Sequence, residues 1–376
     1  MPPASIALVP PPDYAALATP ARVLERLAAV VPEIQARAAR LDQDGAFPAQ
    51  DLALLRDLGA LEVFGGQSAT ALELAQALRL VGRANLSLGR LFEGHVNGAR
   101  LVAWCGDASQ RRRLTQDLAH GRLFGVWNTE PAPGVRIRNS AAGLVLQGVK
   151  SFASGAGHIH RAVVTARTPA GERRMVLADG ADPARADPSG WRVRGMKATA
   201  SGLYDLTDLP ANRETLLGKA GDYEREPRFS AGAWRFAAVQ VGGVERILTL
   251  VRDHLAAFPD RGNMVHRARF GAAVIAARSA WMWVREGAQR AEDPVAGPDE
   301  IALVLMARRA VESAGLEVME TAARLVGTRA FFTDDPIDLA CRDLGLYLRQ
   351  PAPDEALDRA AEAFIARDGW RDDPLW

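Results

Sequence analysis

Cysteine is scarce in this sequence: its 376 residues include only two, Cys105 and Cys341. The two lie far apart and show neither Cys-x-x-Cys nor Cys/His spacing, which excludes a disulfide framework and predicts no metal site. Both fall within apolar, helix-like stretches, where a buried reduced thiol is the ordinary state. That state is typical of a protein of the reducing cytoplasm.

Long hydrophobic runs and an excess of one charge are also lacking. No stretch approaches the roughly 18 uninterrupted apolar residues of a membrane-spanning helix, and no basic region precedes an apolar run at the N-terminus. The 46 basic residues almost balance the 45 acidic ones, giving a net charge of +1. This balance excludes the strong field of a nucleic-acid or membrane-surface binder. We therefore expect a cytoplasmic protein without nucleic-acid or membrane partners.

The composition that is present, 48% hydrophobic and 24% charged residues, is that of a globular protein long enough for two or three domains. Apolar residues recur at helical spacing over 21–121, where Pro32 is expected to kink or restart a helix and Pro48 to open one. From 122 to about 228, short apolar runs alternate with turn residues and predict a β-rich region. The expected strands cover 123–127, 144–152, 162–166, 174–178 and 191–194. Helical periodicity then returns up to 364, with a long helix over 301–325.

Residues 148–156 read Gly-Val-Lys-Ser-Phe-Ala-Ser-Gly-Ala, at the end of one expected strand. Alternate side chains of a strand share a face, so Phe152 and Ser154 are predicted to point the same way. An aromatic ring beside a hydroxyl can stack on, and hydrogen-bond to, a flat heteroaromatic ligand such as a flavin ring. Alone, the segment is more typical of a half-buried strand that ends in a glycine turn, so its neighbours decide between the two.

Several separated motifs surround this segment. They are Phe-Pro, Leu-Arg-Asp-Leu-Gly and Gly-Gly within 47–66, Thr-Glu-Pro at 129–131, Gly-Val-Lys at 148–150, Gly-Met-Lys-Ala-Thr-Ala-Ser at 195–201, Arg-x-x-Phe-Gly at 267–271 and Arg-Asp at 342–343. In this order, they resemble motifs of the acyl-CoA dehydrogenase superfamily of flavoproteins across almost the whole chain. The resemblance implies an α+β fold with an N-terminal helical domain (1–121), a small central β-barrel domain (122–227) and a C-terminal four-helix bundle (228–376).

The resemblance also implies an FAD site between the β domain and the bundle. By position, Thr129 and Ser154 would hydrogen-bond to the flavin ring, and Phe152 would cover one of its faces. Trp127 would add to that aromatic wall. A hydroxyl near the reducible nitrogen stabilises the electron-rich reduced ring, and a dry aromatic wall strengthens that bond.

Two arginines late in the chain are expected to contact the phosphates of the cofactor. Arg267 resembles the residue that reaches the FAD pyrophosphate of a neighbouring subunit, in a homodimer or homotetramer; its alternative is a solvated arginine at a helix end. Arg324 stands where the family usually has Gln and can still meet a phosphate. After Thr-Glu-Pro the family usually continues Gly-Ser-Asp, whereas this chain has Ala132, Pro133 and Gly134, so a phosphate-facing Ser is lost.

The dehydrogenase reaction of the family needs a carboxylate that removes the proton next to the thioester carbonyl. The usual Glu lies about eight residues after the Arg-Asp pair, and the count leads here to Pro351, which cannot accept a proton. Another location used by the family, the start of the first bundle helix, corresponds to Ala233 or Trp234. Asp354 and Glu226 are the nearest weak candidates, although Asp354 is more typical of a helix cap. The base is therefore unassigned.

Three functions follow from these observations. The first is an FAD-dependent, acyl-CoA dehydrogenase-like oxidoreductase acting on the α,β C–C bond of an acyl thioester, with an electron-transfer partner. The second is a flavin monooxygenase of the same superfamily, which uses oxygen and a partner flavin reductase; the strand end at 152–155 and the segment 199–202 resemble that branch. There, His95 is a weak acid/base candidate, with a packing residue as its alternative. The third is a non-catalytic homologue that binds FAD or acyl-CoA.

Overall fold

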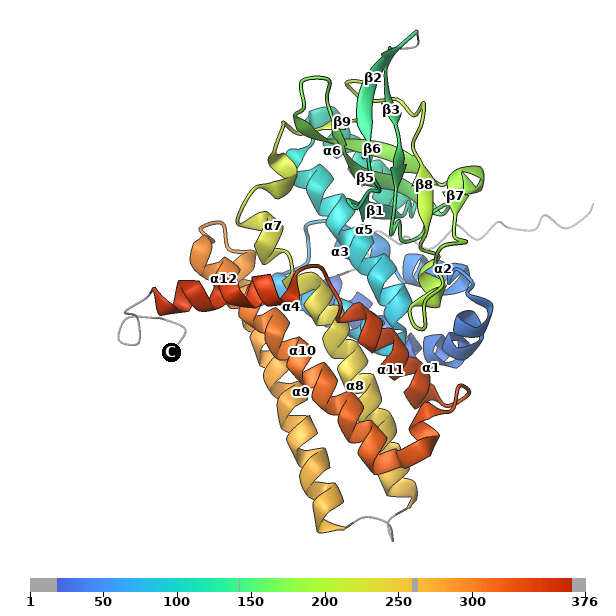
Figure 1. Ribbon diagram of the computed structural model, residues 1–376, viewed down its shortest axis with the longest axis vertical. Coiled ribbons are helices and arrows are strands. Elements are labelled where there is room, and N and C mark those ends of the chain that lie inside the picture. Colours follow the sequence, from blue (N-terminus) through green and yellow to red (C-terminus); the bar gives the residue numbers. More distant parts are fainter. Residues whose placement is uncertain (1–18, 142, 259–262, 367–376) are drawn as a thin grey trace, which may run out of the picture.

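The computed structural model describes residues 19–141, 143–258 and 263–366. The proline-rich start of the chain lies outside these ranges. A region of short strands forms one end of the molecule, and long helices of the last third of the chain extend away from it (Figure 1). Within the described ranges, no helix is both long enough and apolar enough to cross a membrane.

The first third of the chain is helical, as predicted. Its helices are α1 (Pro20–Asp44), α2 (Ala49–Asp57), α3 (Ala60–Gly65), α4 (Ala71–Ala84), α5 (Leu86–Cys105) and α6 (Ala108–Ala119). On α1 the buried residues Val23, Leu27, Val31 and Ile34 follow the helical repeat. The predicted restart at Pro32 is wrong: α1 continues through it. Pro32 lies on the exposed face, where water can hydrate the carbonyl group that it leaves unpaired.

The strands form two sheets. One has the order β3-β2-β5-β6-β9, with β1 pairing in parallel with β5, and the other has the order β4-β8-β7. The strands are β1 (Phe124–Trp127), β2 (Arg136–Ser140), β3 (Gly143–Gln147), β4 (Val149–Lys150), β5 (Ile159–Arg167), β6 (Arg173–Gly180), β7 (Ala186–Asp187), β8 (Leu203–Asp205) and β9 (Leu216–Leu217). Three short 3₁₀ helices lie among or just after them: η2 (Pro183–Arg185), η3 (Lys197–Thr199) and η4 (Asp222–Glu224).

Two strand predictions need correction. The expected strand over 144–152 is divided at Gly148, whose φ of 124° breaks the extended backbone, so that β3 and β4 belong to different sheets. The segment 191–194 forms no strand. Consequently, Phe152 and Ser154 lie beyond the end of β4, in a turn.

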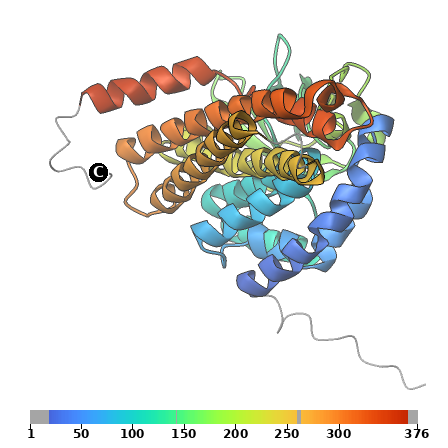
Figure 2. The same cartoon turned by 90° about the horizontal axis from the view of Figure 1, so that it is seen from below.

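The last third of the chain contains α7 (Arg228–Ala231), α8 (Trp234–Ala257), α9 (Met264–Ala291), α10 (Pro298–Val326), η6 (Gly327–Phe331), α11 (Pro336–Tyr347) and α12 (Pro353–Ile365). Helices α8 to α11 pack together as a bundle, and the long helix predicted over 301–325 lies within α10. Helix α4 packs along α8, which joins the N-terminal helices to the bundle. Figure 2 shows α1 and α12 on opposite sides of this bundle.

Candidate functional site

The segment expected to hold a flavin ring lies just after β4. Phe152 has a φ of 52° and is 64% exposed, and its ring meets the ring of Trp191 edge-on at a centroid distance of 6.0 Å. The accessible ring therefore results from a left-handed turn, which few residues other than glycine adopt, and not from strand alternation. An exposed aromatic face held in a strained turn is a suitable platform for a planar ligand.

Ser154 ends a chain of hydroxyl groups that begins in the segment 195–201. The Ser201 Oγ donates to the Ser154 Oγ at 3.1 Å and lies 2.8 Å from the Thr199 Oγ1. The Thr199 hydroxyl donates in turn to the Met196 carbonyl oxygen at 2.8 Å. Because Ser154 accepts within this chain, its own proton remains available to a ligand. Thr199 and Ser201 thus position Ser154, a role that the sequence analysis did not assign to them.

Trp127 lies behind Ser154 and does not form an outer wall. Its side chain is 2% exposed, and its ring packs against Tyr204 at a centroid distance of 4.9 Å. Its Nε1–H donates to the carbonyl oxygen of Ser154 at 3.0 Å. The prediction that Trp127 covers a flavin face is therefore corrected, because its side chain is almost fully buried and supports the Ser154 backbone instead.

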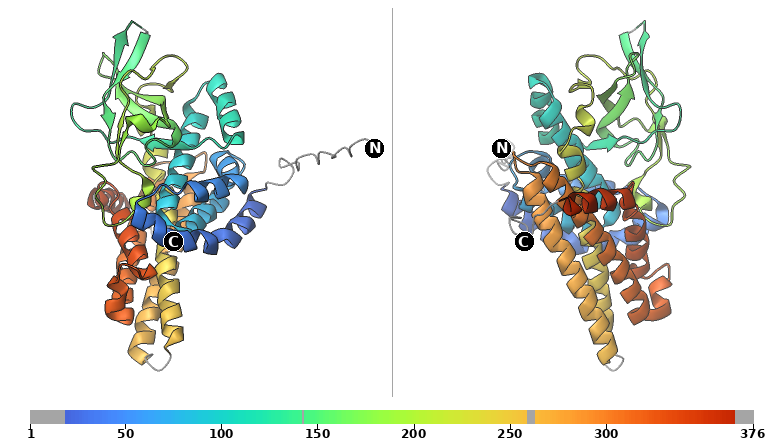
Figure 3. Two further views of the ribbon diagram at one scale, coloured as in Figure 1. Left: turned by 90° about the vertical axis from the view of Figure 1, so that its right-hand side faces the viewer. Right: turned by 60° about the vertical axis from the view of Figure 1, so that its left-hand side comes forward.

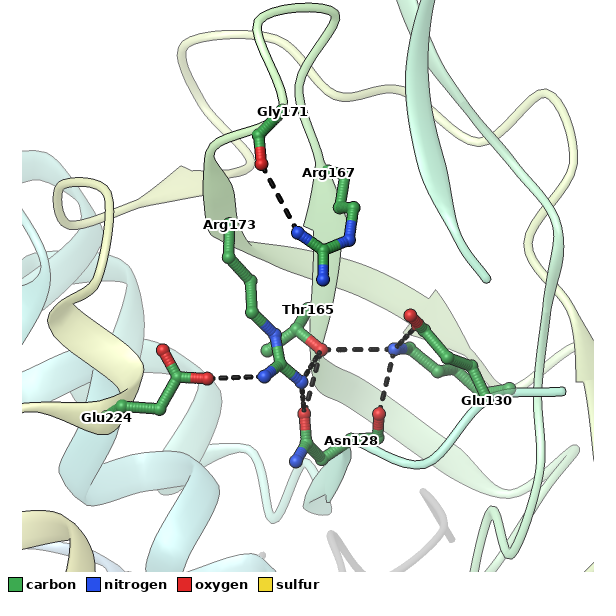
Figure 4. Close-up of polar contacts among 8 residues, drawn as sticks. Asn128, Glu130, Thr165, Arg167, Gly171, Arg173 and Glu224 are labelled. Atoms are coloured by element: carbon green, nitrogen blue, oxygen red, sulfur yellow. Dashed lines mark hydrogen bonds and ion pairs between the residues drawn. The ribbon is translucent and has the colours of Figure 1, made fainter. Parts of the chain in front are cut away.

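Thr129 is exposed at the end of β1, and its carbonyl oxygen accepts from the Ser151 N–H at 2.9 Å. A further contact joins the same segments, and another joins Lys150 to β5. The fully buried Lys150 ammonium pairs with Glu130 and donates to Thr165 Oγ1 at 3.1 Å (Figure 4). The Thr-Glu-Pro and Gly-Val-Lys motifs therefore hold each other in place.

The same polar cluster continues from Thr165 to Arg173 and Asn128. Arg173 donates to Thr165 Oγ1 at 3.2 Å and to the Asn128 side chain at 2.5 Å, and it pairs with Glu224 (Figure 4). Glu224, which lies just upstream of the alternative base position, is thereby engaged in an ion pair. The cluster fixes the β1 end from which Thr129 projects.

His95 is a structural residue. Its ring is fully buried, its Nε2 contacts the Leu61 carbonyl oxygen at 2.8 Å, and its Nδ1 accepts from the Phe124 N–H at 3.2 Å. Burial lowers the pKa of His95 to about 4. The acid/base prediction is therefore corrected: both nitrogens are occupied, and the ring stays neutral near pH 7.

The two carboxylate candidates lie at helix starts. Glu226 accepts from the Ser230 N–H at 2.9 Å and from the Ser230 hydroxyl at 2.5 Å, so it caps α7. Asp354 is exposed in the first turn of α12, where a negative charge stabilises the helix. The carbonyl oxygen of Pro351 accepts from Arg308 at 2.7 Å. Both candidates therefore lie where a carboxylate stabilises the start of a helix, which is the alternative to a catalytic role.

A buried polar network on α5 went unnoticed in the sequence analysis. Arg90, Glu93, Asn97 and Arg100 recur at helical spacing, so they share one face of an otherwise apolar helix. Arg90 pairs with Glu93 at 2.5 Å, and Glu93 also accepts from Asn97. The helical spacing of these four polar residues is visible in the sequence and could have predicted the network.

The network continues into the bundle. Arg235, at the start of α8, donates to Asn97 at 2.5 Å and pairs with Glu292 at 2.8 Å. Arg100 pairs with Glu292 at 2.5 Å, and the buried Trp234 donates to the same carboxylate at 3.2 Å. At the alternative base position, 233–234, the chain has the indole of Trp234 in place of a carboxylate. The neighbouring carboxylate, Glu292, already has three partners: Arg100, Arg235 and Trp234.

Arg90 connects this network to a pocket that Ser154 also lines. A pocket between α5 and β1 is lined by Arg90, Leu91, Gly94, Phe124, Gly125, Val126, Trp127, Ser154 and Ile159. Burial opposes the charge of Arg90, but the Glu93 carboxylate outweighs it, so the pKa of the guanidinium is raised. A permanent cation thus faces the same pocket as Ser154.

Tyr347, the last residue of α11, completes this junction. It is 3% exposed, and its hydroxyl forms no hydrogen bond with the residues that the structure describes. Burial raises the pKa of the Tyr347 phenol well above its usual range, and the neighbouring Glu93 carboxylate adds to the rise. A buried hydroxyl without a partner is costly, which points to a bound molecule or water as its missing partner.

Arg267 and Arg324 lie far from this junction within one chain. Arg267 is exposed in the first turn of α9, and Arg324 is in the last turn of α10, where it pairs with Glu320 at 2.5 Å. Helices α9 and α10 form an antiparallel pair, so both positions are at the end of the bundle that is remote from the strands (Figure 3). Within one chain, neither arginine reaches the Ser154 side.

Comparison with known sequences supports the resemblance drawn from the motifs. No family model matches the chain. The putative acyl-CoA dehydrogenase YdbM of Bacillus subtilis (strain 168) is 24% identical over 374 residues, covering 91% of this chain and 96% of that protein. The probable acyl-CoA dehydrogenase YngJ of the same organism is 29% identical over 150 residues, which cover 36% of this chain and 40% of that protein.

Solved structures share the fold over nearly the whole chain. FMN-bound TdsC from Paenibacillus sp. A11-2 superposes with a TM-score of 0.82 at 19% identity, covering 92% of this chain and 97% of that one. Another structure of TdsC names it a dibenzothiophene monooxygenase. The methanesulfinate monooxygenase MsuC from Pseudomonas fluorescens gives a TM-score of 0.79 at 18% identity, covering 93% of this chain and 97% of that one. The chain therefore has the helix-rich α+β fold shared by acyl-CoA dehydrogenases and flavin-dependent monooxygenases.

Proposed function

We propose that this chain, which has the fold of the acyl-CoA dehydrogenase superfamily, is a flavin-dependent monooxygenase of a small polar substrate. A separate reductase would supply the reduced flavin. The observation that carries the proposal is the charged junction beside Ser154, where Arg90 and Glu93 lie near the unpartnered Tyr347 hydroxyl. An acyl chain needs an apolar tunnel at this place, whereas an ionic cluster suits a polar or anionic group.

The residues after β4 suit a flavin ring. Phe152 offers an exposed aromatic face, and Ser154 and Thr129 offer hydrogen-bonding groups nearby in the fold. FAD, which the superfamily resemblance implies, and FMN, named in the TdsC structure, share this ring. Arg267 and Arg324 of a second subunit would then approach the phosphate end, which requires a homodimer or homotetramer.

Within the junction, the roles follow from charge and protonation. Reduced flavin, when bound, supplies the two electrons with which one atom of O₂ enters the substrate and the other becomes water. Arg90, kept cationic by Glu93, would hold an anionic group of the substrate. Tyr347 lies near Arg90 and Glu93 but does not line this pocket; it keeps its proton at the Oη atom and would donate it to an oxygen atom bound at the junction.

Acyl-CoA dehydrogenation is the second candidate, favoured by the names of the curated relatives. Its base would have to be Glu93, the buried carboxylate of the junction, because position 351 is proline. Glu93, however, already accepts from Arg90 and Asn97, which holds its oxygens away from a substrate C–H bond. The geometry therefore favours oxygenation over proton abstraction.

The test uses the purified full-length chain with added FAD or FMN. With a flavin reductase, NADH and oxygen, we expect turnover of small carboxylates, sulfinates or sulfonates to oxygenated products. Arg90→Gln should raise KM at least about tenfold, corresponding to a lost charge-assisted contact, while Arg138→Gln, at an exposed ion pair, should leave it unchanged.

The same preparation separates the alternatives. Anaerobic bleaching of bound flavin by an acyl-CoA, without a reductase, would select the dehydrogenase and contradict the monooxygenase. Flavin binding without either reaction would support a non-catalytic flavin-binding protein. Absence of flavin binding would overturn both enzymatic functions and leave only a non-catalytic protein that binds acyl-CoA.

A further inference from the structure

A second pocket, with a cavity volume of about 70 Å³, lies between the N-terminal helices and the bundle. It is formed where α1, the α4–α5 junction, α8 and α11 meet, and neither Arg90 nor Ser154 lines it. Its charged side chains are Arg83, Arg246 and Asp343. Because the flavin-side residues are absent from its wall, this pocket is independent of the proposed function.

The arginines meet here because α4 and α8 cross very closely. A Cβ atom at Gly82 would overlap the Val239 carbonyl oxygen, and one at Gly242 would overlap the backbone of α4. Only glycine permits this approach. It brings Arg83, in the last turn of α4, to the same pocket as Arg246 on α8.

These two guanidinium groups have no ion-pair partner among the described residues; the carboxylate whose charge acts on Arg246 is Asp253, which pairs with Arg252 at 2.6 Å. Neither forms an ion pair or a side-chain hydrogen bond with the described residues, and the Arg83 Nε is buried without a partner. The same two helices form an ordinary ion pair nearby. Arg79, one turn before Arg83 on α4, pairs at 2.8 Å with Glu245, the residue before Arg246 on α8. Burial lowers the pKa of Arg246, and the charge of Arg83 lowers it further, against a smaller opposing effect of Asp253. Arg83 and Arg246 are both partly buried, and two such neighbouring cations repel each other unless an anion lies between them.

Asp343 does not serve as that counterion. Its Oδ1 accepts from the Met196 N–H at 2.5 Å, and the charged groups that influence it are Asp42, Arg342 and Lys197. The other lining residues include the apolar Leu86, Leu339 and Ala340. The pocket therefore combines two unpaired cations with an apolar wall.

We propose that this pocket binds a small oxyanion, whose carboxylate or phosphate group bridges Arg83 and Arg246. An apolar part of an organic anion would pack against Leu86 and Leu339. Guanidinium groups suit both kinds of oxyanion because their planar donors can bind two oxygens at once.

The experiment measures binding to the full-length chain by calorimetry at constant ionic strength, with chloride as the background anion. The probes are inorganic phosphate, butyrate and the neutral butyramide. We expect saturable binding of phosphate or butyrate at one site per chain, and none of butyramide. Binding of phosphate alone assigns the ligand to the phosphates, whereas tighter binding of butyrate assigns it to the organic carboxylates.

Variants then locate the site. Arg246→Gln and Arg83→Gln should each weaken binding about tenfold or more, while Arg252→Gln, at an exposed pair with Asp253 on the same helix, should not change it. Without ligand, Arg246→Gln should unfold at the same or a higher temperature, because it removes a repulsion, so loss of binding is not loss of fold. No saturable binding of either anion up to roughly 10 mM, or equal binding by Arg246→Gln, would overturn the proposal.

Discussion

Arg90 and His95 lie on neighbouring turns of α5, yet their surroundings give them opposite states. Arg90 faces a pocket and is paired with a carboxylate, so it remains charged. His95 faces the core, where its partners are a carbonyl oxygen and an N–H group of the backbone. Burial without a countercharge keeps the imidazole neutral, with a pKa of about 4. Histidine is a common acid or base in catalysis, but the two ring nitrogens of His95 instead link α5 to α3 and β1.

This assignment predicts the effect of removing the ring. His95→Ala leaves the Leu61 carbonyl and the Phe124 N–H without their buried partner, which should lower the free energy of unfolding by roughly 2–4 kcal/mol. Urea unfolding measures the change. His120→Ala, at the exposed end of α6, is the control and should stay within about 0.5 kcal/mol of the wild type. An unchanged stability of His95→Ala would contradict the structural role.

At the scale of elements, the crossing of α4 and α8 joins the N-terminal helices to the bundle. Gly82 and Gly242 let the two backbones touch, and the crossing in turn shapes the pocket of Arg83 and Arg246. Where helices pack through backbone atoms, an added methyl group cannot be absorbed by a side-chain rotation.

Gly82→Ala should therefore lower the free energy of unfolding by more than about 2 kcal/mol, because the new methyl group would displace α8. The matched control is Gly271→Ala in α9, where a Cβ atom meets nothing within 4 Å. There, higher helix propensity should leave stability equal or raise it by up to about 1 kcal/mol. Chemical denaturation of both variants gives the comparison, and equal effects would refute the close crossing.

At the scale of the whole molecule, one short segment of α11 ties together all three parts of the chain. Arg342 pairs with Asp42 of α1 at 2.9 Å, and Asp343 accepts from the Met196 N–H beside η3. Burial raises the pKa of Asp343 to about 7. A carboxyl group at the meeting point of helices, strands and bundle thus titrates near neutrality.

This raised pKa predicts how stability depends on pH. The folded state binds the Asp343 proton more tightly than the unfolded chain, whose pKa is about 3.8, so the stabilisation is complete below that value. It is lost as the pH rises through about 7. The melting temperature of the wild type should fall by several degrees from pH 5 to pH 8, relative to Asp343→Asn, which cannot ionise. A parallel pH profile for both proteins would contradict the raised pKa; Asp57→Asn, an exposed control, should keep the wild-type profile.

The order of helices and strands could be predicted because apolar periodicity is a local property. The stripe of Val23 to Ile34 and the long apolar helix that became α10 are both buried as expected. The alternation of side chains did not predict where this strand ends. The backbone turns at Gly148, and the residues before and after it belong to different sheets. Phe152 was expected on a strand face, whereas it lies in a left-handed turn beyond β4; its contact with a flavin stays a prediction.

Local patterns in the chain were sufficient to predict most helices and strands, the superfamily resemblance and the proline at the position of an expected base. Which charges meet could not be predicted in this way, because it depends on how distant segments pack. Arg90 faces Ser154, Glu292 joins Arg100 to Arg235, and Arg83 stands beside Arg246 because segments distant in sequence are packed together. Burial and partners set the protonation and the energy of each group, and both depend on neighbours that no local pattern records.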